Sequence, residues 1–239
     1  VQSYGEAATL NGTYTTTNSA FSVSGTTTLV GATTVTVGSG NVTFTGAVNG
    51  GNTLAVNSTG ATLFSAAVGG TTALTSLTTD AGGTVSLLSV TTSGVQSYGE
   101  AATLNGTYTT TNSAFSVAGT TTLGGGTTVT VGSGPVTFTG AVNGANTLAV
   151  NSTGATLFSA AVGGSTALTS LTTDAGGTVS LLSVTTSGVQ SYGEAATLNG
   201  TYTTTNAAFS VAGATTLGGA TTVTVGSGNV TFTGAVNGA

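Results

Sequence analysis

The chain has 239 residues, lacks Lys, Arg, His, Cys, Met and Trp, and carries a net charge of −5 from its five Asp and Glu residues. Without His, Lys or Cys it has no activated Ser-His or Ser-Lys nucleophile and no usual zinc ligand. Without Lys or Arg it has no cations to neutralise nucleic-acid phosphates. The composition predicts a protein that is not an enzyme, needs no cofactor and binds no nucleic acid.

The remaining composition favours β-strands. The chain is 38% hydrophobic and only 2% charged, which is opposite to the composition of disordered segments. Its abundant Thr, Val, Ser and Gly are poor helix formers, and Thr and Val suit a pleated sheet. No stretch reaches the ~18 consecutive apolar residues of a membrane helix, so no membrane insertion is expected.

The first 94 residues divide into consecutive segments that each predict a strand, a Gly or Asn turn, a second strand and a Gly-rich corner. Residues 1–83 supply four such segments, and residues 84–94 form a shorter fifth one. Each of the four contains an aromatic or aliphatic landmark that we expect in the core, and Phe44 and Phe64 lie 20 residues apart. The landmarks in chain order are Tyr4, Val23, Phe44 and Phe64.

A period near 20 residues is typical of the coils of a β-solenoid, in which parallel strands stack ~4.8 Å apart. The sequence therefore predicts an all-β fold, a parallel β-solenoid with coils of about 20 residues and five coils per 94-residue unit. Five coils would give a rise of roughly 24 Å per unit. A Greek-key sandwich array is the alternative, but a sandwich gives no reason for a 20-residue period.

The unit is repeated along the chain. Residues 1–94 and 95–188 align without gaps, and residues 189–239 begin a third copy, so three repeat units are expected, the last one partial. We interpret the chain as a window on a longer array. The two full copies differ at six positions, which include the replacement of Asn41 by Pro135 at the start of a predicted strand, where a missing N–H is tolerated. The core landmarks of the later copies are Tyr98, Phe138, Phe158, Tyr192 and Phe232.

Two kinds of carboxylate stand out in the repeat. Asp80 and Asp174 lie in the sequence TTDAGGT, where Asp beside Gly-Gly is favoured as a turn residue, with a weak calcium ligand as the alternative. No other metal site is predicted. Glu6 falls on the inward phase of its strand, where a lone carboxylate is costly and would be protonated. A bulge or corner that turns Glu6 outward is the favoured interpretation.

The stretch NVTFTGAVNGGNTLAVNSTGATLFSAAVGGTTALTSLTTDAGG resembles the repeats of filamentous-haemagglutinin-like bacterial adhesins and related giant surface proteins. The resemblance lies in Thr/Gly/Val patterning over the whole chain. It implies a right-handed β-helix, export from a bacterial cell, and a role in adhesion or in extracellular fibres such as those of a biofilm. It supplies no catalytic residues.

These observations lead to a structural hypothesis: a secreted β-solenoid that forms the shaft of an extracellular filament or giant adhesin at the cell surface. Its expected partners are copies of itself, either end to end in one long chain or bundled laterally. The alternative is a binding module whose outward Thr, Ser and Asn ladders contact cell-surface glycans. Ice binding is less favoured, because Thr-x-Thr triplets such as residues 34–36 and 43–45 lie in different strands.

Overall fold

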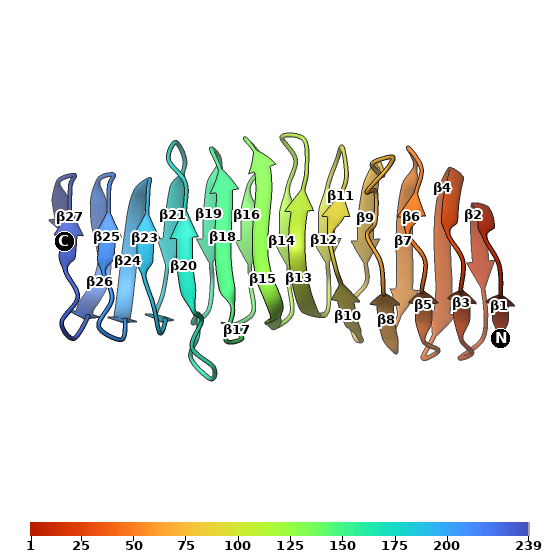
Figure 1. Cartoon of the computed structure of the whole chain (residues 1–239), viewed down its shortest axis with the longest axis horizontal. Helices are drawn as coiled ribbons and strands as arrows, with labels where there is room; N and C mark the ends of the chain where they lie inside the picture. Colours follow the sequence, from red (N-terminus) through yellow and green to blue (C-terminus); the bar gives the residue numbers. More distant parts are fainter. Residues whose placement is uncertain (239) are drawn as a thin grey trace.

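Alternation of apolar and small polar residues produces strands throughout the chain. The computed structural model describes residues 1–238, in which 28 strands and no helix are present. The strands wind into a parallel β-solenoid of about 11 turns, whose turns stack side by side along one axis (Figure 1). The prediction of an all-β parallel solenoid is confirmed.

The strands have the following bounds in the first repeat unit: β1 (Gln2–Tyr4), β2 (Ala8–Thr15), β3 (Phe21–Val23), β4 (Thr27–Gly38), β5 (Val42–Phe44), β6 (Val48–Asn49), β7 (Thr53–Ser58), β8 (Ala61–Phe64), β9 (Ser76–Thr79), β10 (Thr84–Leu87) and β11 (Val90–Thr91). The second unit contains β12 (Gln96–Tyr98), β13 (Ala101–Thr109), β14 (Phe115–Val117), β15 (Thr121–Gly132), β16 (Val136–Phe138), β17 (Val142–Asn143), β18 (Thr147–Ser152), β19 (Ala155–Phe158), β20 (Ser170–Thr173), β21 (Thr178–Leu181) and β22 (Val184–Thr185). The third unit contains β23 (Gln190–Tyr192), β24 (Ala195–Thr203), β25 (Phe209–Val211), β26 (Thr215–Thr224), β27 (Val230–Phe232) and β28 (Val236–Gly238).

Every strand pairs in parallel with a strand of the neighbouring turn. In the column that begins β1, Gln2 pairs with Phe21, Phe21 with Val42, and Val42 with Thr62. Successive partners are therefore 19, 21 and 20 residues apart, which agrees with the coil length expected from the Phe44–Phe64 spacing.

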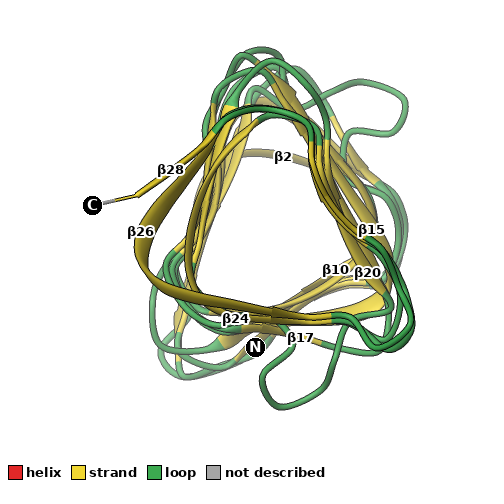
Figure 2. Cartoon of the chain, turned by 90° about the vertical axis from the view of Figure 1, so that its left-hand side faces the viewer, coloured by secondary structure: helices red, strands yellow, loops and turns green. Residues whose placement is uncertain are grey.

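Seen along its axis, the solenoid has a three-sided cross-section around a common core (Figure 2). The longest strands bend around a corner and so contribute to two faces. In β13, for example, the pairing register with β15 shifts between Leu104 and Gly106. Pairing follows two 14-stranded paths, and the first path passes from one face to the next where β13 and β15 bend.

The number of turns per unit differs from the expectation. Residues 1–83 make four turns, but the short segment 84–94 supplies only β10 and β11, which cover two of the three faces of the next turn. The third face is completed by β12 of the following unit, whose Tyr98 pairs with Thr79. A unit therefore spans four and two-thirds turns, and the prediction of five coils per 94-residue repeat is wrong.

This fractional turn rotates each copy by one face relative to the copy before it. Tyr4 pairs with Val23 on one face, whereas its equivalent Tyr98 pairs with Thr79 on another. Tyr192 pairs with Thr173 on the face of β18 and β20, which is the third one. Identical residues consequently return to the same face only after three units.

The predicted core landmarks point into the solenoid. Seven of the nine are at most 1% exposed: Val23, Phe44, Phe64, Tyr98, Phe138, Phe158 and Tyr192. The other two lie in terminal turns of the described chain, which have a neighbouring turn on one side only. Tyr4 is 36% exposed and Phe232 is partly buried.

Aromatic rings stack along the axis inside the core. Phe44 and Phe64 are parallel, with ring centroids 5.2 Å apart and an interplanar angle of 5°. Their equivalents Phe138 and Phe158 repeat this geometry at 5.1 Å and 6°. Such contacts add to the stability gained from burial of the rings themselves.

Asn112 should be a sensitive position in a corner. Its backbone has φ of +52°, and its Oδ1 accepts a hydrogen bond of 3.0 Å from the Ser133 N–H of the next turn. We expect Asn112→Ala to lower the free energy of unfolding by about 1–2 kcal/mol, because it loses the hydrogen bond and strains the left-handed backbone. Asn112→Gly should cost less, since Gly adopts positive φ readily. Urea denaturation followed by circular dichroism compares them, and an Ala variant as stable as wild type would contradict the expectation.

Candidate functional site

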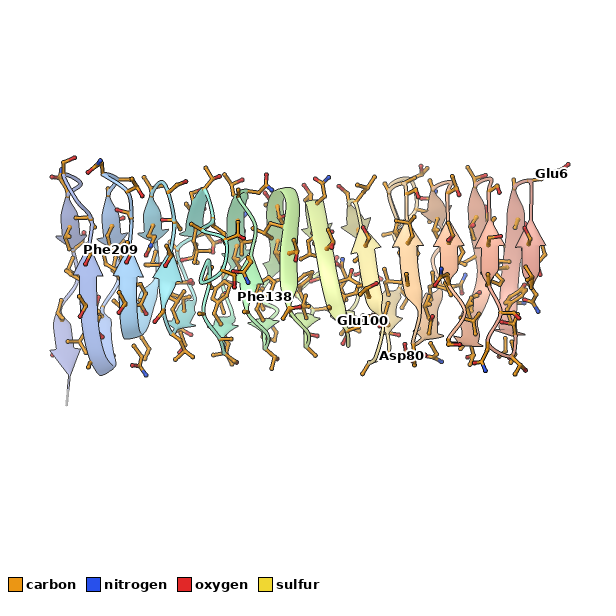
Figure 3. All side chains as sticks on the ribbon, turned by 90° about the horizontal axis from the view of Figure 1, so that it is seen from below. Glu6, Asp80, Glu100, Phe138 and Phe209 are labelled. Atoms are coloured by element: carbon orange, nitrogen blue, oxygen red, sulfur yellow. The ribbon has the colours of Figure 1, made fainter. Side chains whose placement is uncertain are left out.

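The repeat units meet at a corner that carries two carboxylates. Asp80 follows β9, and Glu100 lies between β12 and β13 one turn further on. Because Thr79 of β9 pairs with Tyr98 of β12, the corner that holds Glu100 stacks directly on the corner that holds Asp80. Figure 3 shows the two residues on neighbouring turns, one from each repeat unit.

The second junction repeats this arrangement. Thr173 of β20 pairs with Tyr192 of β23, which stacks the corner of Glu194 on the corner of Asp174. Asp80 Oδ1 accepts a hydrogen bond of 2.8 Å from the Ser58 N–H, and Asp174 Oδ1 accepts one of 2.9 Å from the Ser152 N–H. The chain thus contains two carboxylate pairs, Asp80–Glu100 and Asp174–Glu194, which we call the junction pairs.

The two glutamates of the junction pairs are buried without partners. Glu100 and Glu194 are each 3% exposed, and none of their four carboxylate oxygens makes a hydrogen bond of normal geometry with the described residues, although Thr79, Thr173 and the Gly177 backbone lie close to them. The hydroxyls of Thr79 and Thr173, which are buried beside them, also lack hydrogen-bond partners there. Each junction therefore holds a group of buried oxygens whose capacity to accept hydrogen bonds or to bind an ion is unused.

Burial changes the acidity of these glutamates. Loss of solvation raises the pKa of Glu100 to about 7, the neighbouring Thr79 hydroxyl opposes part of that rise, and the nearby Asp80 carboxylate adds to it. The same causes raise the pKa of Glu194 to about 7, with the Gly177 backbone also favouring the charged form. Glu100 and Glu194 therefore gain or lose a proton near neutral pH.

Glu6 and its equivalents in the two later units differ in exposure. Glu6 itself is exposed and lies in the first turn of the chain (Figure 3), where no turn of the described residues lies beneath it. Its equivalents Glu100 and Glu194 have a preceding turn beneath them and are buried. An outward-turning corner is therefore wrong for these two copies, because the corner backbone keeps the inward phase and the turn beneath covers the side chain.

Asp80 and Asp174 lie directly before the bends of residues 81–83 and 175–177, in the corner loops that their Gly-Gly context indicated. They are half-buried, and each uses one carboxylate oxygen to cap a backbone N–H of the preceding turn. The junction pairs were not predicted from the sequence, in which Asp and Glu lie in separate motifs. The available signal was the 20-residue separation of Asp80 and Glu100, which equals one coil.

The outward faces carry ladders of small polar residues. Serines that stack in neighbouring turns hydrogen bond to each other, with Oγ–Oγ distances of 3.0 Å for Ser22 and Ser3 and 3.2 Å for Ser116 and Ser97. The ladders are mixed rather than uniform. In the column that continues from Ser116 through Thr137, the next position is Leu157, which is 40% exposed.

Other kinds of site were not found in residues 1–238. That part of the chain has no pocket and no group of three or more metal-ligating side chains, and none of its segments is a helix that could cross a membrane. The candidate functional sites are therefore the junction pairs and the outward ladders. Comparison with protein-family models, with curated proteins and with solved structures finds no match for this chain.

Proposed function

We propose that this chain is the shaft of an extracellular filament or giant adhesin, a structural element whose length is set by the number of repeat units. The observation that carries this proposal is the continuity of strand pairing across unit junctions. At the first junction β9 pairs with β12, and β10 pairs with β13, in the same parallel geometry as strands within a unit. A unit boundary is therefore not a domain boundary, and added units lengthen one rod.

The composition suits such a rod. Each turn places its residues above those of the turn before it, so a charged position would form a ladder of like charges, which is destabilising. The chain avoids this with hydroxyl, amide and apolar side chains and only five carboxylates. A function at the cell surface and contact with neighbouring copies are part of the proposal, supported by the resemblance to adhesin repeats.

The proposal predicts how the rod grows. Adding one 94-residue unit should lengthen the particle by about 22 Å at constant cross-section, from four and two-thirds turns of ~4.8 Å each. Identical features should recur on the same face every three units, or about 67 Å. Small-angle scattering of the chain with and without an added unit, and electron microscopy of longer arrays, measure these values. Compact globules, or a cross-section that grows with unit number, would contradict the shaft.

The outward serine and threonine ladders favour one second candidate, a glycan-binding surface. Exposed aromatic rings, on which sugars commonly stack, are scarce: Tyr4 is the only aromatic residue among the strongly exposed hydrophobic side chains of the described chain, at 36%. The ladders would therefore have to bind through hydroxyl and amide groups. A glycan array separates the two functions, because a passive shaft should bind no glycan above background.

A further inference from the structure

The junction pairs concentrate negative charge that the chain cannot neutralise. Asp80 and Glu100 face each other across one turn, and the chain contains no Lys, Arg or His that could pair with them. Isolated buried carboxylates are costly unless they are protonated, paired or bound to a metal. A counter-charge for the pair can therefore come only from a proton or from an ion in solution.

The atoms at each junction that could bind an ion and that make no hydrogen bond are all oxygens. Glu100 contributes two carboxylate oxygens, Thr79 contributes its hydroxyl, and each of these three atoms is buried without a hydrogen-bond partner. Asp80 lies beside them with one oxygen engaged by the Ser58 N–H. The Thr79 hydroxyl lies close enough to Glu100 to favour its charged form, yet it makes no hydrogen bond of normal geometry, although a buried hydroxyl usually does.

Backbone carbonyls also lie near Glu194 at the second junction, and that of Gly154 already accepts a hydrogen bond from the Thr178 N–H. The carbonyl oxygens of Ser152 and Gly154 and Oε2 of Glu194 all lie within 3 Å of the position that a Cβ on Gly177 would occupy. At the first junction the carbonyls of Ser58 and Gly60 surround the equivalent position at Gly83. A side chain at either glycine would clash with these oxygens.

We propose that each junction pair binds one calcium ion, between Asp80 and Glu100 at the first junction and between Asp174 and Glu194 at the second. Calcium takes six to eight oxygen ligands in flexible geometry, and carboxylate, hydroxyl and carbonyl oxygens are what the corner offers. Magnesium demands near-ideal octahedral geometry and retains water, which suits a tightly stacked corner less well. Zinc is disfavoured because the chain has no His or Cys.

The position of the proposed ions gives them a structural role. Asp80 belongs to the last full turn of one unit, whereas Glu100 belongs to the first turn of the next. An ion held by both would fasten consecutive units to each other. Within this chain Glu6 has no preceding Asp partner, so two ions per chain are expected and Glu6 is an internal control. This inference is independent of the shaft proposal, because a solenoid with another function could bind the same ions.

Calorimetric titration of the metal-free 239-residue chain with calcium chloride at pH 7.5 tests the proposal. We expect two sites in the wild type, one in Glu100→Gln, and binding at least tenfold weaker in the double variant Glu100→Gln/Glu194→Gln. Glu6→Gln should retain both sites. Gln keeps the size of Glu and removes its charge, so the variants should fold, which circular dichroism verifies.

Two further measurements test where the ion binds and whether calcium is preferred to magnesium. Terbium, a luminescent calcium substitute, should emit by transfer from Tyr98 and Tyr192, which lie two residues before the glutamates, and the double variant should lose this emission. Calcium should raise the melting temperature of the wild type by several degrees more than magnesium does. An absence of calcium binding in the wild type, or equal binding in the double variant, would overturn the proposal and leave a proton as the only counter-charge.

Discussion

Phe158→Ala is expected to lower the free energy of unfolding by about 3–5 kcal/mol, the usual cost of truncating a buried aromatic side chain. Phe158 is 1% exposed and stacks on Phe138 with ring centroids 5.1 Å apart. The turns on both sides are fixed by backbone pairing, since β19 pairs with β16 on one side and with β21 on the other. The core therefore cannot collapse easily to fill the space that the ring leaves.

The adjacent residue provides the matched control. Leu157 lies on the same strand, points outward and is 40% exposed, so Leu157→Ala should change the free energy of unfolding by less than about 1 kcal/mol. Urea denaturation of both variants, followed by circular dichroism in the β-sheet region, makes the comparison. Equal losses at the two positions would show that the aromatic column is not the main source of stability.

The fold could be predicted because a stacked coil imposes its length on the sequence. Phe44 and Phe64 are separated by 20 residues, and in the structure they are direct partners in neighbouring turns. The alternation of apolar and polar residues around them then identified which side chains face inward. Residues 84–94 were harder to place, because a segment that covers two faces carries the same strand pattern as a short coil. Only the pairing of Tyr98 with Thr79 reveals the missing third face.

The junction pairs were harder to predict from the sequence for a related reason. The residue beneath Glu100 depends on the register between units, and a five-coil unit places residues 84–94, instead of Asp80, beneath the start of the next copy. Glu6 was also a misleading representative, because its turn has no neighbour beneath it in this chain. Burial of Glu100 and Glu194 depends on that neighbouring turn and therefore could not be deduced from the first copy alone.

The fractional turn has a consequence for any function at the surface. Because each unit is rotated by one face, three consecutive units present the same residues on all three faces of the rod. A partner that recognises one face would find its site once every three units, about 67 Å apart. A partner that surrounds the rod would find equivalent sites at every unit. This arrangement suits lateral contacts with neighbours on several sides better than a single continuous binding face.

Raising the pH from about 4.5 to 8 in metal-free buffer should destabilise this protein. Glu100 and Glu194 have a pKa of about 7 in the folded chain, compared with 4.5 when unperturbed. Between these values the folded state binds more protons than the unfolded state, so the free energy of unfolding falls as the pH rises. The stabilisation is fully present below about pH 4.5 and is lost through pH 7. We expect a loss of about 1–3 kcal/mol per glutamate, on the order of the difference in pKa between the two states.

The cause of this dependence can be isolated with the junction variants. Asp80 is the charged group that faces Glu100 from the turn beneath, while the corner above it, residues 118–120, has no titratable side chain. Glu100→Gln/Glu194→Gln should therefore flatten the profile of urea midpoints between pH 4.5 and 8, whereas Glu6→Gln should leave it unchanged. A wild-type stability that increases over this range would contradict burial of the glutamates. Calcium and protons would neutralise the same oxygens, so calcium should restore stability above pH 7 and have little effect near pH 4.5.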